Sequence, residues 1–264
     1  MATTTSLDAQ AFLAIQYKPK YDQWPYDTAD FQRYDENDDR VFYQQARLVT
    51  HIDDPAINRL TQYYDTVLPR TGKIMDMCTS WKSFYPFAVK EAIQDKNLEV
   101  FGVGLNAEEM KLNGVFQDAE HWRVMDLNKP PYDVRAGWEG KDLKFNAVTC
   151  VVSIDYLIKP LEICKNLLNA TNEGGSIHLV ISNRCFPNKV VRRWMMLSER
   201  SRLELVGDYL HFAGWQNVEI VDVCARDENG KRVTDDHGTV LVDSPRLPSH
   251  LDPLWVVRAT KHSS

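Results

Sequence analysis

The sequence lacks three features that mark other classes of protein. Its 264 residues contain no run of about 18 apolar residues, so no membrane span is expected. Basic residues do not predominate, because 37 acidic residues outweigh 31 basic ones and give a formal charge of -6. A general nucleic-acid binder is usually basic, so nucleic acid is not an expected partner. The start, MATTTSLDAQAF, has no basic segment followed by an apolar one, so no secretory signal is expected.

Cysteine is also scarce, and its spacing is uninformative. The five cysteines are odd in number and form no C-x-x-C pair; they are Cys78, Cys150, Cys164, Cys185 and Cys224. Neither a disulfide framework nor a metal site is therefore expected. We expect a cytoplasmic protein that acts as a monomer or a homodimer.

Residues 1–50 form a segment of distinct composition. They are acidic, polar and aromatic, with poor periodicity, and they contain too many aromatic residues for simple disorder. We interpret them as an extended N-terminal arm or cap, followed by one domain over residues 51–264. The arm's aromatic side chains either line an acceptor pocket or only fasten the arm; they are Tyr17, Tyr21, Trp24 and Tyr26.

Strand and helix patterns alternate from residue 73 onward. A helix beginning near Asp53 or Asp54 precedes the first short strand, KIMDM, and a second helix is predicted from about Ser83. Further strands are predicted at 98–105, 121–127, 145–154, 173–182, 216–225 and 253–260. Helices are predicted at 106–113, 159–171 and 188–213, the last as one helix or as two pieces. Lys189, Arg192 and Arg193 are expected on a solvated helix face.

This alternation predicts an α/β fold with helices on both faces of a mostly parallel sheet. The last two strands follow each other with no helix between them. An antiparallel strand is therefore expected at the end of the sheet.

The turn after the first strand, MDMCTSWKSFYP (residues 75–86), is poor in glycine. A dinucleotide site needs G-x-G-x-x-G for close approach of the backbone to a pyrophosphate, so NAD or FAD binding is improbable. Asp76 either belongs to a site for a ligand without phosphates, such as S-adenosyl-L-methionine, or only caps the loop.

An ordered set of stretches resembles class I S-adenosylmethionine-dependent methyltransferases of the type-11-like group. The resemblance covers roughly residues 50–225, and its stretches are LPRTGKIMDMCTSW, VFGVGLNAEEM, WRVMDLN, FNAVTCVVSIDYLIKP, NEGGSIHLVISNRCFP and LHFAGWQNVEIVDV. It implies a three-layer, Rossmann-like, seven-stranded mixed sheet with the last strand antiparallel. It also implies S-adenosyl-L-methionine as the cofactor.

The resemblance places the cofactor on three loops. Asp76 matches the acid of the first strand, while Cys78 and Ser80 stand where the family has glycines. Gly104 replaces the acid that usually binds the ribose, so Asn106 is expected to bind the ribose, to cap the next helix, or both. Asp126 matches the acid that receives the adenine amino group, with Leu127 beside it.

The acceptor is expected beyond the fourth and fifth strands. Ser153, Asp155 and Tyr156 follow the fourth strand, where an acid and an aromatic ring can favour a cation; Asp155 could instead cap the next helix. Arg184 could clamp a carboxylate or phosphate, or pair with Asp155 or a loop.

The segment before the first strand often covers the active site in this fold. His51 could act as a general base or merely cap or pack. Tyr43, Arg47 and Trp81 are assigned to substrate binding.

The expected activity is methyl transfer to a small-molecule acceptor. Two alternatives stay open, a protein that binds the cofactor but catalyses non-methylating chemistry such as cyclisation or elimination, and a non-catalytic partner subunit.

Overall fold

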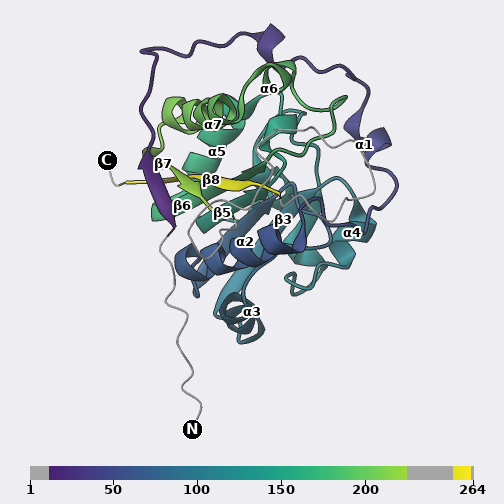
Figure 1. Cartoon of the computed structure of the whole chain (residues 1–264). Helices are drawn as coiled ribbons and strands as arrows, with labels where there is room; N and C mark the ends of the chain where they lie inside the picture. The colour runs from purple at the N-terminus through teal and green to yellow at the C-terminus, as the bar shows by residue number, and fades with distance from the viewer. Residues whose placement is uncertain (1–11, 225–251, 263–264) are drawn as a thin grey trace.

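A twisted sheet crosses the centre of the protein (Figure 1). Its eight described strands follow the order β1-β7-β8-β6-β5-β2-β3-β4. The computed structural model describes residues 12–224 and 252–262. Its strands are β1 (Leu13–Gln16), β2 (Gly72–Met77), β3 (Leu98–Gly104), β4 (Trp122–Val124), β5 (Phe145–Val151), β6 (Thr171–Ser182), β7 (Gln216–Asp222) and β8 (Leu254–Thr260).

The predicted mixed sheet with an antiparallel last strand is confirmed, but it has one strand more than expected. Strands β2 to β6 pair in parallel, and β8 is antiparallel to both β6 and β7. The eighth strand, β1, comes from the arm and pairs antiparallel with β7, from Leu13 opposite Asp222 to Gln16 opposite Glu219. The sequence did not reveal it because its four side chains are all exposed, which leaves no alternating pattern.

Helices cover both faces of the sheet, as the three-layer prediction requires (Figure 1). Residues of α2 and α3 pack on one face, in a cluster that includes Leu60, Tyr64 and Val89. Residues of α5 and α7 pack on the other, with Ile163 and Leu210. The helices are α1 (Asp39–Phe42), α2 (Asp54–Val67), α3 (Phe87–Gln94), α4 (Ala107–Lys111), α5 (Pro160–Ala170), α6 (Arg192–Met196) and α7 (Glu199–Ala213).

Several predicted boundaries move for local reasons. Helix α2 begins as expected, because the Asp53 side chain accepts a hydrogen bond from the Ala56 backbone N–H at 2.9 Å. Helix α3 begins at Phe87 and not near Ser83, because Pro86 disfavours helical geometry in the residue before it. Four short 3₁₀ helices fall in connections; they are η1 (Thr28–Phe31), η2 (Ala119–His121), η3 (Val134–Trp138) and η4 (Ile154–Tyr156).

The arm runs from β1 at one edge of the sheet across the molecule to α1 near α4 (Figure 1). Its aromatic residues fasten it to α7, because the hydroxyls of Tyr17 and Tyr26 both donate to the buried carboxylate of Asp208. Trp24 stacks on Phe31 with 6.0 Å between ring centres. The fastening alternative therefore describes these residues, and none of them lines the cavity described below.

Among the described residues, no helix is both long and apolar enough to cross a membrane. Residues 1–11 of the expected arm and residues 225–251 and 263–264 of the expected domain lie outside the described residues.

Candidate functional site

A cavity of about 840 Å³ lies at the carboxyl ends of the parallel strands. The strand register brings these ends together, with Met77 of β2 opposite Val103 of β3 and Cys150 of β5, and Val151 opposite Val180 of β6. In open α/β sheets this edge is where ligands bind. The residues that follow β2, β3, β4, β5 and β6 all contribute to the lining, and the end of the arm closes it.

Thirteen of the fourteen predicted site residues line this cavity. They are Tyr43, Arg47, His51, Asp76, Cys78, Ser80, Trp81, Asn106, Asp126, Leu127, Ser153, Tyr156 and Arg184. Asp155 does not line it, although it follows Ser153 directly. Their individual roles remain predictions, and the contacts of each residue decide what it is free to do.

Asp76 lies at the bottom of the cavity and holds the loop that follows it. One carboxylate oxygen accepts a hydrogen bond from Thr149 at 2.9 Å, and the other accepts from Thr79 and, at 2.6 Å, from Ser83. Burial raises the pKa of this carboxyl, while the hydrogen bonds from the three hydroxyls act in the opposite direction. The loop-capping alternative therefore describes the contacts of Asp76 within the chain.

Three residues around the cavity adopt left-handed backbone conformations without being glycine. Cys78 has φ +56°, Phe84 +54° and Val152 +42°, and all three line the cavity. Such geometry is unfavourable for side chains with a Cβ, most of all for a β-branched residue, and strained backbone often gathers at functional sites. Cys78 thus keeps the conformation of a glycine at the position where the family usually has one.

The missing acid after β3 has a steric cause. A Cβ on Gly104 would lie 2.2 Å from the backbone oxygen of Thr79, far inside contact distance. The loop is held there because the Thr79 backbone N–H donates to the Val103 carbonyl at 2.7 Å. The loop after β2 therefore occupies the space that a side chain at position 104 would need.

Both the oxygen and the nitrogen of the Asn106 side-chain amide form hydrogen bonds within the chain. Its oxygen accepts from the backbone N–H groups of Glu108 and Glu109 at 2.9 and 3.0 Å, which confirms the helix-cap alternative. Its nitrogen donates to the carbonyls of Tyr43 and Gln44 at 2.9 and 3.2 Å, which ties down the arm. A ribose contact by this amide would compete with those bonds.

Asp126 offers an acceptor that the chain does not use. Its Oδ1 accepts from the Asn128 backbone N–H at 2.9 Å, but its buried Oδ2 has no hydrogen-bond partner among the described residues. Burial raises the pKa of this carboxyl, and the nearby charge of Asp39 adds to the effect. A buried unpaired acceptor is costly, so a donor on a ligand would stabilise it.

After β5, the adjacent residues Asp155 and Tyr156 differ in position, because Tyr156 lines the cavity and Asp155 does not. The Tyr156 phenol oxygen accepts from the Phe186 backbone N–H at 2.8 Å, and burial raises its pKa well above the usual value. Asp155 is buried away from the cavity, and desolvation raises its pKa to about 7. Asp155 does not cap α5, because Lys159 occupies the N-cap position of that helix. It does not pair with Arg184 either, since the Nε of Arg184 donates to Asp252 at 2.6 Å.

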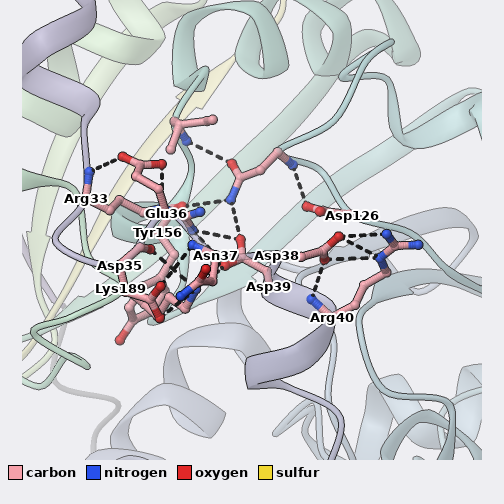
Figure 2. A network of polar contacts seen from close by, with 12 residues as sticks. Arg33, Asp35, Glu36, Asn37, Asp38, Asp39, Arg40, Asp126, Tyr156 and Lys189 are labelled. Atoms are coloured by element: carbon pink, nitrogen blue, oxygen red, sulfur yellow. Dashed lines mark hydrogen bonds and ion pairs between the residues drawn. The ribbon is translucent and has the colours of Figure 1, made fainter.

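The arm's second anchor is a buried ion cluster beside the cavity (Figure 2). Asp39 accepts from Arg33 at 2.7 Å and pairs with Lys189 at 3.1 Å, and Lys189 also pairs with Asp35 at 3.1 Å. The Lys189 side chain is only 1% exposed, so the expected solvated position is wrong for this residue. Arg193 is also engaged, with Asp30 at 2.8 Å, and Arg192 alone of the three is exposed.

Asp39, Glu109 and Phe186 are among the lining residues that sequence reasoning missed. Glu109 carries a usable signal, since it lies one turn after Asn106 and so faces the same strand end. Asp39 and Phe186 come from the arm and from the connection after β6, where no periodicity indicates direction. Among the described residues, no group of His, Cys, Asp and Glu side chains could hold a metal ion.

Comparisons with known proteins give only distant matches. No protein-family model and no curated protein matches the sequence. Solved structures that match include phosphoethanolamine N-methyltransferase 2 of Haemonchus contortus in complex with S-adenosyl-L-methionine, at 14% identity and TM-score 0.47 over 78% of this chain and 52% of that one. This chain thus spans about half of that enzyme.

Two further matches have similar scores. A TehB-like SAM-dependent methyltransferase of Corynebacterium glutamicum matches at 15% identity and TM-score 0.43, over 79% of this chain and 89% of that one. The [4+2]-cyclase SpnF matches at 13% identity and TM-score 0.49, over 78% and 82%. The strand order of the sheet itself, with its parallel strands β2 to β6 and its antiparallel β8, gives this chain the Rossmann-like fold that its resemblance to class I methyltransferases implies.

Proposed function

We propose that this chain binds S-adenosylmethionine and transfers its methyl group to a small-molecule acceptor. The observation that carries the proposal is the unpaired Oδ2 of Asp126, buried at a cavity formed by the carboxyl ends of the parallel strands. An adenine amino group is a donor of the kind this oxygen lacks. Leu127, next in the chain, offers its backbone to the same ring.

Other residues that line the cavity also fit S-adenosylmethionine. Carboxylates of Asp76, Glu109 and Asp126 line it, which favours a ligand that carries a cationic sulfonium. Glu109 accepts from the Arg47 backbone N–H at 2.7 Å and from the Ser80 hydroxyl at 2.6 Å, one bond on each oxygen. A carboxylate has further acceptor capacity, so Glu109 is our candidate for the ribose hydroxyls in place of the missing acid.

When bound, S-adenosylmethionine supplies an electrophilic methyl group. The chain's part is to align an acceptor atom with it and to exclude water, and such positioning accounts for a large share of rate enhancement. Tyr43, Tyr156 and Trp81 line the cavity and would position the acceptor. His51 also lines it, near the ring of Phe186 at 5.5 Å between centres, and would take a proton from an acceptor that carries one.

Non-methylating chemistry is the second candidate, and the cofactor loop favours it. Asp76 and Asn106, two of the expected cofactor ligands, are already hydrogen-bonded to other groups of the chain. A cradle altered in this way could hold a cofactor without presenting its methyl group.

The test is calorimetric titration of the protein with S-adenosylhomocysteine. Replacing Asp126 by Ala should weaken binding tenfold or more, about 1.4 kcal/mol, because the adenine amino group loses its acceptor. Asp142→Ala, at an exposed position outside the cavity, is the matched control and should leave affinity unchanged.

The outcomes separate the candidates. No binding by the unaltered protein would eliminate both cofactor proposals and leave the non-catalytic subunit. Binding without methyl consumption over a panel of acceptors would favour the second candidate. Equal affinity of Asp126→Ala and the unaltered protein would refute the adenine assignment.

A further inference from the structure

We propose that the acceptor is an oxyanion, a carboxylate or a phosphate monoester, held by Arg47 and Arg184 at the β5–β6 end of the cavity. This inference rests on the proposed function and names the substrate class for it. It follows from which charged side chains line the cavity, and from which of them are already paired within the chain.

Charged side chains of both signs line the cavity. Asp76 lies in β2, and Asp126 and Glu109 follow β4 and β3; their carboxylates line the part of the cavity that we propose for the cofactor. Arg47 comes from the end of the arm and Arg184 from the connection after β6, and both line the cavity, with the Arg47 guanidinium 5.1 Å from the ring of Phe186 in that connection. A cationic cofactor and an anionic acceptor would each meet the opposite charge in this arrangement.

Arg47 is held in place, and no ion pair joins its guanidinium to another described residue. Its guanidinium lies over the ring of Phe42 at 4.5 Å and near that of Phe186 at 5.1 Å, which fixes the plane of the group. Its backbone N–H is bound by Glu109, so the main chain is fixed as well. Its Nη1 is buried and has no hydrogen-bond partner among the described residues.

Such a group is costly in an empty site. A buried guanidinium nitrogen without an acceptor loses the hydrogen bonds that water would give it. Its two aromatic neighbours supply attraction but no acceptor oxygen. A bound carboxylate or phosphate would supply one in the planar, forked geometry that arginine prefers.

Arg184 presents a second, oriented guanidinium. Its Nε donates to Asp252 at 2.6 Å, and the other oxygen of Asp252 accepts from the Asp53 backbone N–H at 2.7 Å, so the carboxylate is fixed at the start of α2. The terminal nitrogens of Arg184 make no hydrogen bond to the described residues, and the side chain is 17% exposed. One edge of the guanidinium is thus anchored, and its terminal nitrogens keep free donors.

Asp252 pairs with Arg184 through Nε alone, and no ion pair joins Arg47 to a described carboxylate. Asp39 lines the cavity but is already paired with Arg33 and Lys189. Asp155 lies outside the lining, as described above. Two donors with unused capacity therefore remain for a ligand, which fits an oxyanion better than a neutral or cationic group.

The test compares small aromatic probes that differ in charge. Titrations of the protein saturated with S-adenosylhomocysteine use benzoate and phenyl phosphate as oxyanions and benzamide as the neutral counterpart. At least one oxyanion should bind tenfold or more tightly than benzamide, and its affinity should fall as salt is raised. The preferred probe, benzoate or phenyl phosphate, identifies the carboxylate or the phosphate.

Variants assign the preference to the arginines. Arg47→Gln should remove the preference for the oxyanion while S-adenosylhomocysteine still binds, and Arg47→Lys should retain part of it because the charge remains without the fork. Arg192→Gln, exposed on α6 and outside the cavity, is the matched control. Thermal unfolding of each variant shows whether it is folded.

Equal binding of benzoate, phenyl phosphate and benzamide would overturn the inference, and so would no binding of either oxyanion or an unchanged preference in a folded Arg47→Gln. Failure of the proposed function is distinguishable from this. If S-adenosylhomocysteine does not bind, the same titrations on the unliganded protein still decide whether the site selects oxyanions.

Discussion

Asp155→Asn should stabilise the protein in a strongly pH-dependent way. The carboxyl is 4% exposed, its Oδ2 has no hydrogen-bond partner among the described residues, and desolvation raises its pKa from 3.8 to about 7. Arg202 acts in the opposite direction but does not offset the burial. The unaltered protein must therefore either keep this carboxyl protonated or bury a poorly compensated charge.

The sign follows from proton linkage. Between the unfolded and the folded pKa the folded state binds more protons, so the free energy of unfolding falls as pH rises through this window. The penalty is nearly absent below the unfolded pKa and complete above about pH 7. At about pH 8 it amounts to roughly 4 kcal/mol and at about pH 5 to roughly 2 kcal/mol, since each pKa unit is worth about 1.36 kcal/mol.

The measurement is urea unfolding of both proteins at the two pH values. The amide carries no titrating charge, so the variant's advantage should be about 2–3 kcal/mol larger at the higher pH, whatever fixed offset the new amide introduces. Glu91→Gln, at an exposed position of α3, is the matched control and should show no such change. An advantage of Asp155→Asn that is the same at both pH values would refute the reasoning.

Two further predictions concern the loop and the arm. Gly104→Ala should lower the free energy of unfolding by about 1–3 kcal/mol, because the new Cβ meets the backbone oxygen of Thr79; an unchanged urea midpoint would contradict this. Lys189→Met should cost about 3–5 kcal/mol, because it leaves Asp35 and Asp39 short of a buried cation. It should also speed proteolysis of the arm, and equal cleavage rates would count against the cluster as an anchor.

The sequence was a good guide to the repeating part of the fold. The nearly continuous apolar run of β5 and the alternation of strands and helices predicted a mostly parallel sheet, because parallel strands buried on both faces are rich in apolar side chains. The two consecutive strands β7 and β8 predicted the antiparallel end, because no helix separates them in the sequence. The exposed β1 could not be predicted, since its position depends on backbone pairing with β7 and not on a buried face.

The site was predictable in position but not in the state of its residues. Strand ends meet at one edge of a parallel sheet, which is why Asp76, Ser153 and Arg184 could be placed around one cavity without a structure. Asp155 shows the limit of this rule, because a short 3₁₀ turn after β5 sends adjacent side chains in different directions.

The sequence by itself determined the order of strands and helices, the polar residues at the strand ends and the unusual glycine-poor loop. Only the tertiary structure decided which of those polar atoms are still free. Hydrogen bonds between segments far apart in the chain occupy Asp76 and Asn106, whereas Asp126 Oδ2 and Arg47 Nη1 have no hydrogen-bond partner among the described residues. Such partners depend on three-dimensional contacts, which local patterns of hydrophobicity do not record.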